Sequence, residues 1–211
     1  MQVRPVSTEV LVEELADRFA DDRRPVGRLR VAIDGPAAAT PGALAGALSS
    51  ALRARGRPAV HVSAADFLRP ASLRLEFGRT NPDSFYAGWV DEAGLRREVL
   101  DPAGPLGSGR IVTRLWNAAT DRAAREPYRE LPQRAVVLVS GPLLLGAGLP
   151  FDVTVHLALS PAALARRTDP AEQWTLPAFA RYAAEVDPAA FADVVVRLDD
   201  PQRPAVVLRH E

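Results

Sequence analysis

Short apolar runs alternate along the chain with longer segments in which apolar positions recur every three or four residues. Continuous or near-continuous apolar runs predict buried strands at 29–34, 59–63, 135–139, 153–159, 194–198 and 205–208. Helical periodicity predicts helices at about 7–22, 42–55, 161–167 and 176–185. Ser7 or Thr8 is placed to cap the first of these helices. Strands that alternate with helices indicate an α/β fold with a mainly parallel sheet covered on both faces.

Two other stretches qualify this pattern. Residues 110–116 alternate in polarity, which predicts a strand in an excursion or hairpin. The longest apolar run, 135–150, is broken by Ser140, Gly141 and Pro142 and is too short to span a bilayer. Because the chain has no internal repeats and no long linker, residues 1–211 are expected to form a single domain.

Composition narrows the class of protein. Of 211 residues, 47% are hydrophobic and 25% charged, which is typical of a globular protein. The formal net charge of zero argues against a nucleic-acid-binding protein, and the acidic, helical N-terminus is unlike a secretory signal, so we expect a cytoplasmic protein with no membrane contact. There is no cysteine, and all 26 basic residues are arginine.

The segment 31–48 has the layout of a phosphate-binding loop but lacks its chemical groups. Such a loop reads G-x-x-x-x-G-K-[ST] between a buried strand and a helix; its lysine bridges phosphates and its hydroxyl holds magnesium. Counting from Gly35, the second glycine falls on Thr40, the lysine on Pro41 and the hydroxyl residue on Gly42. The helix that begins near Pro41 still has free N–H groups and a positive dipole end, so weak anion binding is predicted.

Five further segments resemble one known family. They are Ala65 to Pro70 (ADFLRP), Gly78 to Tyr86 (GRTNPDSFY), Leu95 to Pro105, residues 184–204 (AEVDPAAFADVVVRLDDPQRP) and Ile33-Asp34-Gly35. Together they resemble the uridine kinase branch of the P-loop kinases, especially the short bacterial uridine kinase-like proteins, over about residues 30–204. The resemblance implies a three-layer P-loop NTPase fold with a mainly parallel five-stranded sheet, and a degenerate phosphate loop at 35–42.

The departures from that family bear on catalysis. The acid that would accept the substrate's proton is replaced by Ala65, and the acid that would organise magnesium at the end of the fourth strand is replaced by Ser140. Asp66 is the nearest surviving candidate base, but it lies one residue along, where an extended segment would turn it to the other face. No catalytic residue and no metal site are therefore expected. If activity is retained, ATP and Mg²⁺ would be required.

The resemblance also implies where ligands would bind. Nucleotide or phosphate contacts would come from Gly35, Ala38, Ala39, Thr40 and Gly42, and from Arg166 and Arg167 at the start of a lid-like segment at about 166–180. An acceptor nucleoside would contact Arg69, Arg79, Asp83 and Tyr86. The alternative is that Tyr86 and Trp89 are packing aromatics and the arginines a solvated surface. His61 and His156 fall in strands and are interpreted as core or strand-end residues.

Three hypotheses remain open from the sequence. The first is a uridine kinase-like protein deficient in phosphotransfer, with a retained nucleoside or phosphate pocket. The second is an active nucleoside or small-molecule kinase with an arginine-based phosphate site. The third is a non-enzymatic interaction or regulatory module, for example a homo-oligomer.

Overall fold

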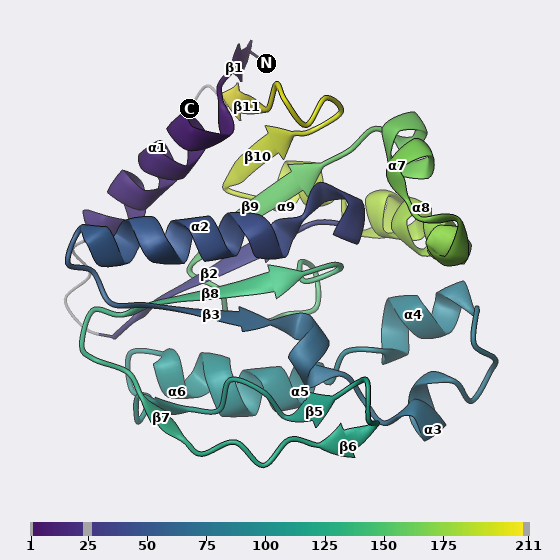
Figure 1. Cartoon of the computed structure of the whole chain (residues 1–211), viewed down its shortest axis with the longest axis horizontal. Coiled ribbons are helices and arrows are strands. Elements are labelled where there is room, and N and C mark those ends of the chain that lie inside the picture. The colour runs from purple at the N-terminus through teal and green to yellow at the C-terminus, as the bar shows by residue number, and fades with distance from the viewer. Residues whose placement is uncertain (1, 23–26, 209–211) are drawn as a thin grey trace.

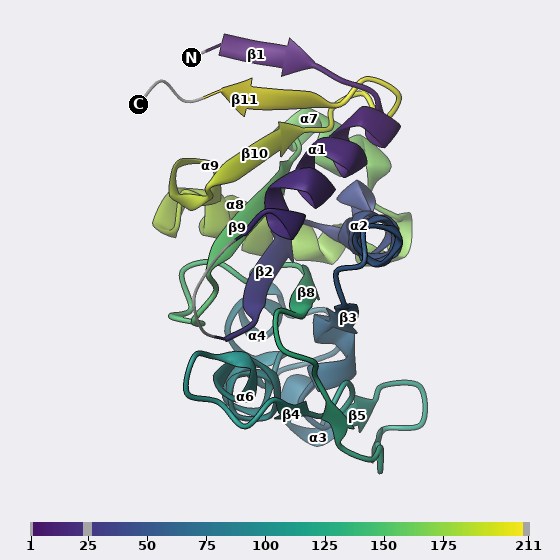
Figure 2. The same ribbon diagram turned by 90° about the vertical axis from the view of Figure 1, so that its left-hand side faces the viewer.

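A seven-stranded, mostly parallel sheet forms the centre of the computed structural model, which describes residues 2–22 and 27–208 (Figure 1). Its strands are β1 (Gln2–Pro5), β2 (Leu29–Asp34), β3 (Ala59–Ser63), β8 (Val136–Gly141), β9 (Val153–Ala158), β10 (Val194–Arg197) and β11 (Ala205–Leu208). They lie in the order β1-β11-β10-β9-β2-β8-β3, which Figure 2 shows from one edge to the other. The predicted domain's ends, residues 1 and 209–211, lie outside the described residues.

The five central strands, from β10 to β3, run parallel to one another, as predicted. Two antiparallel strands extend the sheet beyond this core, because β11 pairs with both β10 and β1. The sequence predicted β11 but not β1. Four residues that end in Pro5 carry little strand signal of their own, and β1 forms through its pairing with β11, with Val3 opposite Val207.

Helices cover both faces of the sheet. The α-helices are α1 (Thr8–Ala20), α2 (Pro41–Ala54), α3 (Ala71–Arg74), α4 (Pro82–Gly88), α5 (Glu92–Leu95), α6 (Asp101–Ala103), α7 (Pro161–Arg167), α8 (Leu176–Glu185) and α9 (Pro188–Phe191). The 3₁₀ segments are η1 (Ala37–Ala39), η2 (Ala64–Phe67) and η4 (Pro170–Thr175), and the π-helical stretch η3 (Arg96–Leu100) joins α5 to α6.

Each strand alternates its side chains between two hydrophobic layers. Val31 and Ile33 of β2 point to the layer formed with α1 and α2, in which Phe19 and Leu48 are fully buried. Ala32 points to the opposite layer, which is formed with the 92–103 helical segment, α8 and α9. The molecule is therefore built in three layers, α/β/α, as the sequence predicted.

Local signals explain where several elements begin. Ser7 caps α1 by accepting a hydrogen bond from the N–H of Val10 at 3.2 Å. The helical segment 92–103 was not predicted, because Gly94 and Pro102 are poor helix formers. It forms because Asp91 caps its first turn and its inward side chains are fully buried.

The excursion between this helical segment and β8 carries four two-residue strands. Where a strand was predicted at 110–116, the structure has two separate ones, β4 (Arg110–Ile111) and β5 (Trp116–Asn117). These pair with β7 (Arg129–Glu130) and β6 (Arg122–Ala123) respectively. None of the helices in the described ranges is long and apolar enough to cross a membrane.

Candidate functional site

The candidate site lies at the carboxyl-terminal edge of the parallel strands, where β2, β3, β8 and β9 all end. Open α/β sheets place ligands at this edge, because the loops that follow the strands converge there. The segment 35–42, which the sequence predicts to be a degenerate phosphate loop, follows β2, and the segment with Ala65 and Asp66 follows β3. The lid-like segment, made of the end of α7, η4 and α8, lies beside them (Figure 1).

The phosphate loop at 35–42 hydrogen-bonds to itself. The Ala39 N–H donates to the Pro36 carbonyl at 2.8 Å. The Thr40 N–H donates to the Ala37 carbonyl at 2.9 Å, which completes the 3₁₀ turn η1. A phosphate nest needs successive N–H groups that are free and point at a common centre. Two of the N–H groups predicted to contact phosphate are instead used within the loop.

The entry and exit of this loop are both tightly constrained. Gly35 lies against β9, where an added Cβ would stand 2.9 Å from the Cβ of Leu157. Thr40 adopts the left-handed conformation, with φ of 52°, in a position where a P-loop has glycine. Pro41 then begins α2 at a helix position that suits proline because its missing N–H would have no helical partner.

Arg167 fastens the loop from the lid side. Its guanidinium donates from Nη2 to the Ala38 carbonyl and from Nη1 to the Leu198 carbonyl, each at 2.5 Å. Leu198 directly follows β10, so Arg167 connects the loop at 35–42 to the segment that follows β10. The neighbouring Arg166 is exposed and forms no ion pair or hydrogen bond with the described residues.

A buried carboxylate holds the base of the site together. Asp34, at the end of β2, has no exposed surface. It accepts hydrogen bonds from the Leu144 N–H at 2.9 Å and the Tyr182 hydroxyl at 3.2 Å. Nδ1 of His156 lies 2.7 Å from its second oxygen. The Tyr182 hydroxyl also accepts from the Leu145 N–H at 3.0 Å, so α8 is anchored to the sheet through this network.

The chemistry of this network is structural. Burial, together with the nearby Asp34 carboxylate, raises the pKa of Tyr182 far above its ordinary value. The hydroxyl therefore stays protonated and donates to Asp34. His156 is a satisfied, buried residue, which agrees with its interpretation from the sequence.

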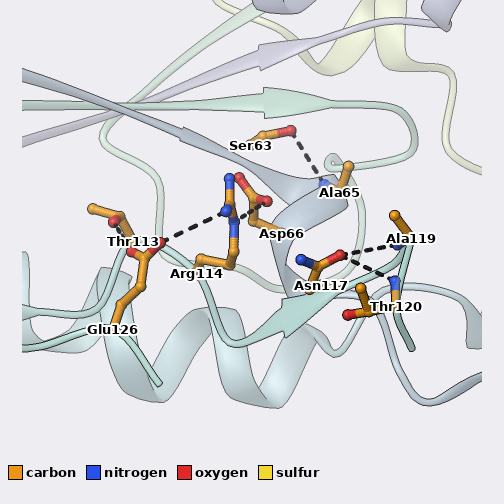
Figure 3. Close-up of polar contacts among 9 residues, drawn as sticks. All are labelled: Ser63, Ala65, Asp66, Thr113, Arg114, Asn117, Ala119, Thr120 and Glu126. Atoms are coloured by element: carbon orange, nitrogen blue, oxygen red, sulfur yellow. Dashed lines mark hydrogen bonds and ion pairs between the residues drawn. The ribbon is translucent and has the colours of Figure 1, made fainter. Parts of the chain in front are cut away.

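Asp66 is paired with Arg114 of the excursion (Figure 3). Its carboxylate accepts a 2.6 Å hydrogen bond from Nε of Arg114, which also lies 3.7 Å from Glu126 on the excursion. The sequence predicted that Asp66 lies on an extended segment, but η2 is a 3₁₀ helix. The side chains of Ala65 and Asp66 therefore point in directions set by three residues per turn and not to opposite faces of a strand. Ala65 lines the cleft in its place.

Ser140, at the position where the family resemblance implies a magnesium-organising acid, contacts His61. Oγ of Ser140 lies 2.7 Å from Nε2 of His61. A side chain added at Gly42 would start 3.8 Å from that Oγ and 3.9 Å from the imidazole Cε1. Burial lowers the pKa of His61, and the charge of Asp66 opposes this weakly. Among residues 2–22 and 27–208, no group of three acidic or histidine side chains is arranged to hold a metal ion.

Two cavities open on the cleft. The apolar cavity has a volume of about 200 Å³ and is lined by Ala64, Ala65, Leu68, Phe85, Tyr86, Ala87, Gly88, Trp89, Val90, Glu92, Pro142, Leu143, Leu144 and Leu149. The loop cavity, of about 390 Å³, is lined by Pro36, Ala37, Ala38, Phe85, Pro142, Arg167, Thr168, Asp169, Glu172, Thr175 and Phe179. Phe85 and Pro142 line both cavities, so these two side chains lie on the wall that the cavities share.

An aromatic cluster joins α4 to the lid. The ring of Phe85 packs edge-on against Trp89 at 5.3 Å, Trp174 at 5.7 Å and Phe179 at 5.8 Å between centroids. Trp174 belongs to η4 and Phe179 to α8, so the wall between the cavities is fixed by rings from both sides. Aromatic pairs of this geometry stabilise by roughly 0.5–1.5 kcal/mol beyond their buried area.

A polar cluster fastens the same two helices. The Arg181 guanidinium lies 4.3 Å from the centroid of the Tyr86 ring and pairs with Glu185 at 2.8 Å and Asp83 at 3.3 Å. The Tyr86 hydroxyl donates to Glu185 at 3.0 Å. Desolvation raises the pKa of Tyr86, and the hydrogen bond to the Glu185 carboxylate raises it further. The hydrogen bond from Arg181 lowers the pKa of Glu185.

The residues predicted to bind an acceptor do not converge. Tyr86 lines the apolar cavity, whereas Arg69 and Asp83 line an outer groove on the other side of α4. Arg79 is exposed and makes no polar contact with the described part of the chain. The sequence did not single out Glu92, which lines the apolar cavity. The one hint in the sequence is that this acidic residue comes soon after the aromatic residues of the segment 78–86.

Comparison with solved structures places this fold among kinase-like proteins. The structure of a possible uridine kinase from Bacillus stearothermophilus superposes with a TM-score of 0.70 at 20% identity, covering 89% of this chain and 97% of that one. A candidate fructose transport system kinase from Silicibacter sp. TM1040 gives 0.55 at 23% identity, covering 87% and 91%. The protein YGR205w gives 0.58 at 10% identity, covering 96% and 98%.

These matches establish the fold, and the fold is the one that the sequence predicted. No family model matches the chain, and no curated protein matches it either. The likeness to the kinases is therefore one of architecture.

Proposed function

We propose that this chain is a uridine kinase-like protein without phosphotransfer activity, whose cleft binds a small molecule. The observation that carries the proposal is the closed phosphate loop, in which the Ala39 and Thr40 N–H groups are bonded within the loop and Arg167 holds the Ala38 carbonyl. For these groups to contact a phosphate, the loop would have to break its own hydrogen bonds.

The charges around the loop support the same proposal. The loop cavity contains the carboxylates of Asp169 and Glu172 against a single guanidinium, that of Arg167. A nucleoside triphosphate carries several negative charges, and such a site would repel it rather than attract it. Gly42 supplies no hydroxyl and Ser140 supplies no carboxylate for magnesium. The site would therefore bind Mg²⁺ weakly, and Mg²⁺ would do little to reduce the repulsion between the phosphates and the carboxylates.

The wall between the cavities also argues against phosphotransfer. In-line transfer requires the reacting atoms to approach within about 3–3.5 Å. Phe85 and Pro142 lie on the boundary between the loop cavity, where a donor would lie, and the apolar cavity, where an acceptor would lie. Asp66, the nearest candidate base, is occupied by Arg114. The proposal treats the chain as cytoplasmic, as its sequence predicts.

A coupled assay with ATP or GTP, Mg²⁺ and a nucleoside panel tests the proposal. Turnover above roughly 1 s⁻¹, the low end for kinases, would refute it. Calorimetric titration with ATP, with and without Mg²⁺, measures binding separately, and we expect no saturable heat. The folded state of the sample is checked by circular dichroism, so that inactivity is not confused with unfolding.

A kinase with an arginine-based phosphate site is the second candidate. It is favoured by one observation, that Arg166 is exposed and unpaired among the described residues close to the loop's tether at Arg167. It predicts a Mg²⁺-dependent rise in melting temperature with ATP, because a ligand stabilises the state that it binds. Substitution of Arg166 by glutamine would abolish that rise.

A further inference from the structure

The apolar cavity is walled almost entirely by hydrocarbon. Ala65 and Leu68 come from the segment after β3, Val90 follows α4, and Leu143 and Leu144 follow β8. The only side chains in its lining that carry a hydrogen-bonding group are Tyr86, Trp89 and Glu92. The Tyr86 hydroxyl is already bonded to Glu185, and the indole nitrogen of Trp89 is fully covered by protein.

Glu92 is the one charged side chain in the lining. The residue is exposed although it lines the cavity, so it lies where the cavity meets solvent. No other described residue forms an ion pair or hydrogen bond with this carboxylate. Partial burial raises the pKa of Glu92, which means that its charge is incompletely solvated and lacks a compensating partner.

Two of the arginines near the cavity are already paired with carboxylates. Arg181 lies over the ring of Tyr86 and is paired with Asp83 and Glu185. Arg74 lies over Trp89, 5.2 Å from the ring centroid, and 3.6 Å from the carboxylate of Asp121. Arg69 lines the outer groove, where its Nη1 would lie 3.7 Å from a Cβ added at Gly88. In the lining of the apolar cavity itself, Glu92 is the charged side chain, and its charge is negative.

Size limits the ligand to a single ring or a short chain. The cavity measures about 200 Å³. A cavity of roughly 150 Å³ is sufficient to hold one benzene molecule. The available volume therefore accommodates a ring with a short substituent that reaches the opening, and the substituent would end beside Glu92.

A nucleoside does not suit this lining. Its ribose hydroxyls and base edge need several hydrogen-bonding partners, and each buried group left without one costs about 1–3 kcal/mol. The lining offers one free carboxylate, while Asp83 and Arg69, which the family resemblance implied for the sugar, line the groove on the other side of α4.

We infer that the apolar cavity binds a small organic amine, with its hydrocarbon body in the cavity and its ammonium group at the Glu92 carboxylate. This inference rests on the proposed function, since it names the ligand class of the same cleft. The apolar wall supplies the burial of the body, and the charge-assisted hydrogen bond at Glu92 selects the amine over a neutral analogue.

Titration with benzylamine and benzyl alcohol tests the assignment, because the two probes share a ring and differ in charge. Binding is followed by ligand-observed NMR on the full chain. We expect saturable benzylamine binding that weakens about tenfold in Glu92→Gln, while the weaker binding of benzyl alcohol is the same in both proteins. Glu76→Gln, which removes an exposed carboxylate outside the cavity, is the matched control and should bind benzylamine as the wild type does.

A second variant locates the site. Ala65 is exposed at the cavity wall, so Ala65→Leu should fold normally, narrow the cavity and weaken both probes. Equal benzylamine binding in the wild type and Glu92→Gln, or tighter binding of uridine than of benzylamine, would overturn the amine assignment. Kinase turnover in the coupled assay would overturn the proposed function. Absence of benzylamine binding in a protein without turnover would overturn the ligand class alone.

Discussion

Substitution of Arg167 separates a structural arginine from a phosphate-binding one. Arg167→Gln removes two hydrogen bonds from a charged donor to the carbonyls of Ala38 and Leu198, both at 2.5 Å. A hydrogen bond to a charged group contributes about 1.5–3 kcal/mol. Because Arg167 is only partly buried and water can replace some of each bond, we expect a total loss of about 1.5–3 kcal/mol. For a chain of this size that corresponds to a fall in melting temperature of about 3–12 °C.

The neighbouring residue gives a matched control. Arg166→Gln removes the same charge from an exposed side chain without described partners, so its effect should stay within about 0.5 kcal/mol. Both variants are compared by thermal and urea denaturation monitored by circular dichroism. If Arg167→Gln melts with the wild type, or if it lowers an ATP-dependent thermal shift instead of the intrinsic stability, the tether interpretation is wrong.

Three further predictions concern the buried network, the imidazole beside Ser140 and the wall between the cavities. Tyr182→Phe removes a donor to Asp34 and leaves the Leu145 N–H without its partner, which should cost about 2–4 kcal/mol in urea denaturation; a loss under about 0.5 kcal/mol would contradict it. His61 should titrate below about 6.5 in NMR, because burial lowers its pKa in the folded state. Its contribution to stability is then complete above about pH 6.5 and is lost as the pH falls toward the lowered folded pKa. His61→Gln should remove this pH dependence of stability, and a His61 pKa above about 6.5 would contradict the burial argument. Phe85→Ala removes three ring contacts and should lower the free energy of unfolding by about 2–3 kcal/mol. An unchanged melting temperature in this variant would contradict the prediction.

The sheet was the most predictable part of this molecule. Strands 29–34 and 59–63 and helices 161–167 and 176–185 occur with the predicted bounds, because their apolar runs, proline starts and caps act locally. The edge strand β1 and the helical segment 92–103 could not be predicted in the same way. β1 depends on pairing with β11, and the helical segment overcomes Gly94 and Pro102 by burying its inner face.

The site was less predictable than the fold because its contacts join residues far apart in sequence. The sequence shows where residues 40–42, 65 and 140 depart from the family that the chain resembles. It did not predict that Arg167 would bond to the carbonyls of two distant segments, or that Asp66 would pair with Arg114. Charged side chains have long reach, and their partners are set by tertiary packing that no local pattern records.

The wall that the two cavities share would couple them if a ligand moved the Phe85 ring against its aromatic neighbours. The Phe85 ring is a boundary of both, so a ligand that displaces it from one side changes the volume offered on the other. Linkage is reciprocal, and the factor by which an occupant of the apolar cavity alters affinity in the loop cavity must equal the factor in the reverse direction. The size of that factor would measure how far the packing of one ring holds the two cavities independent of each other.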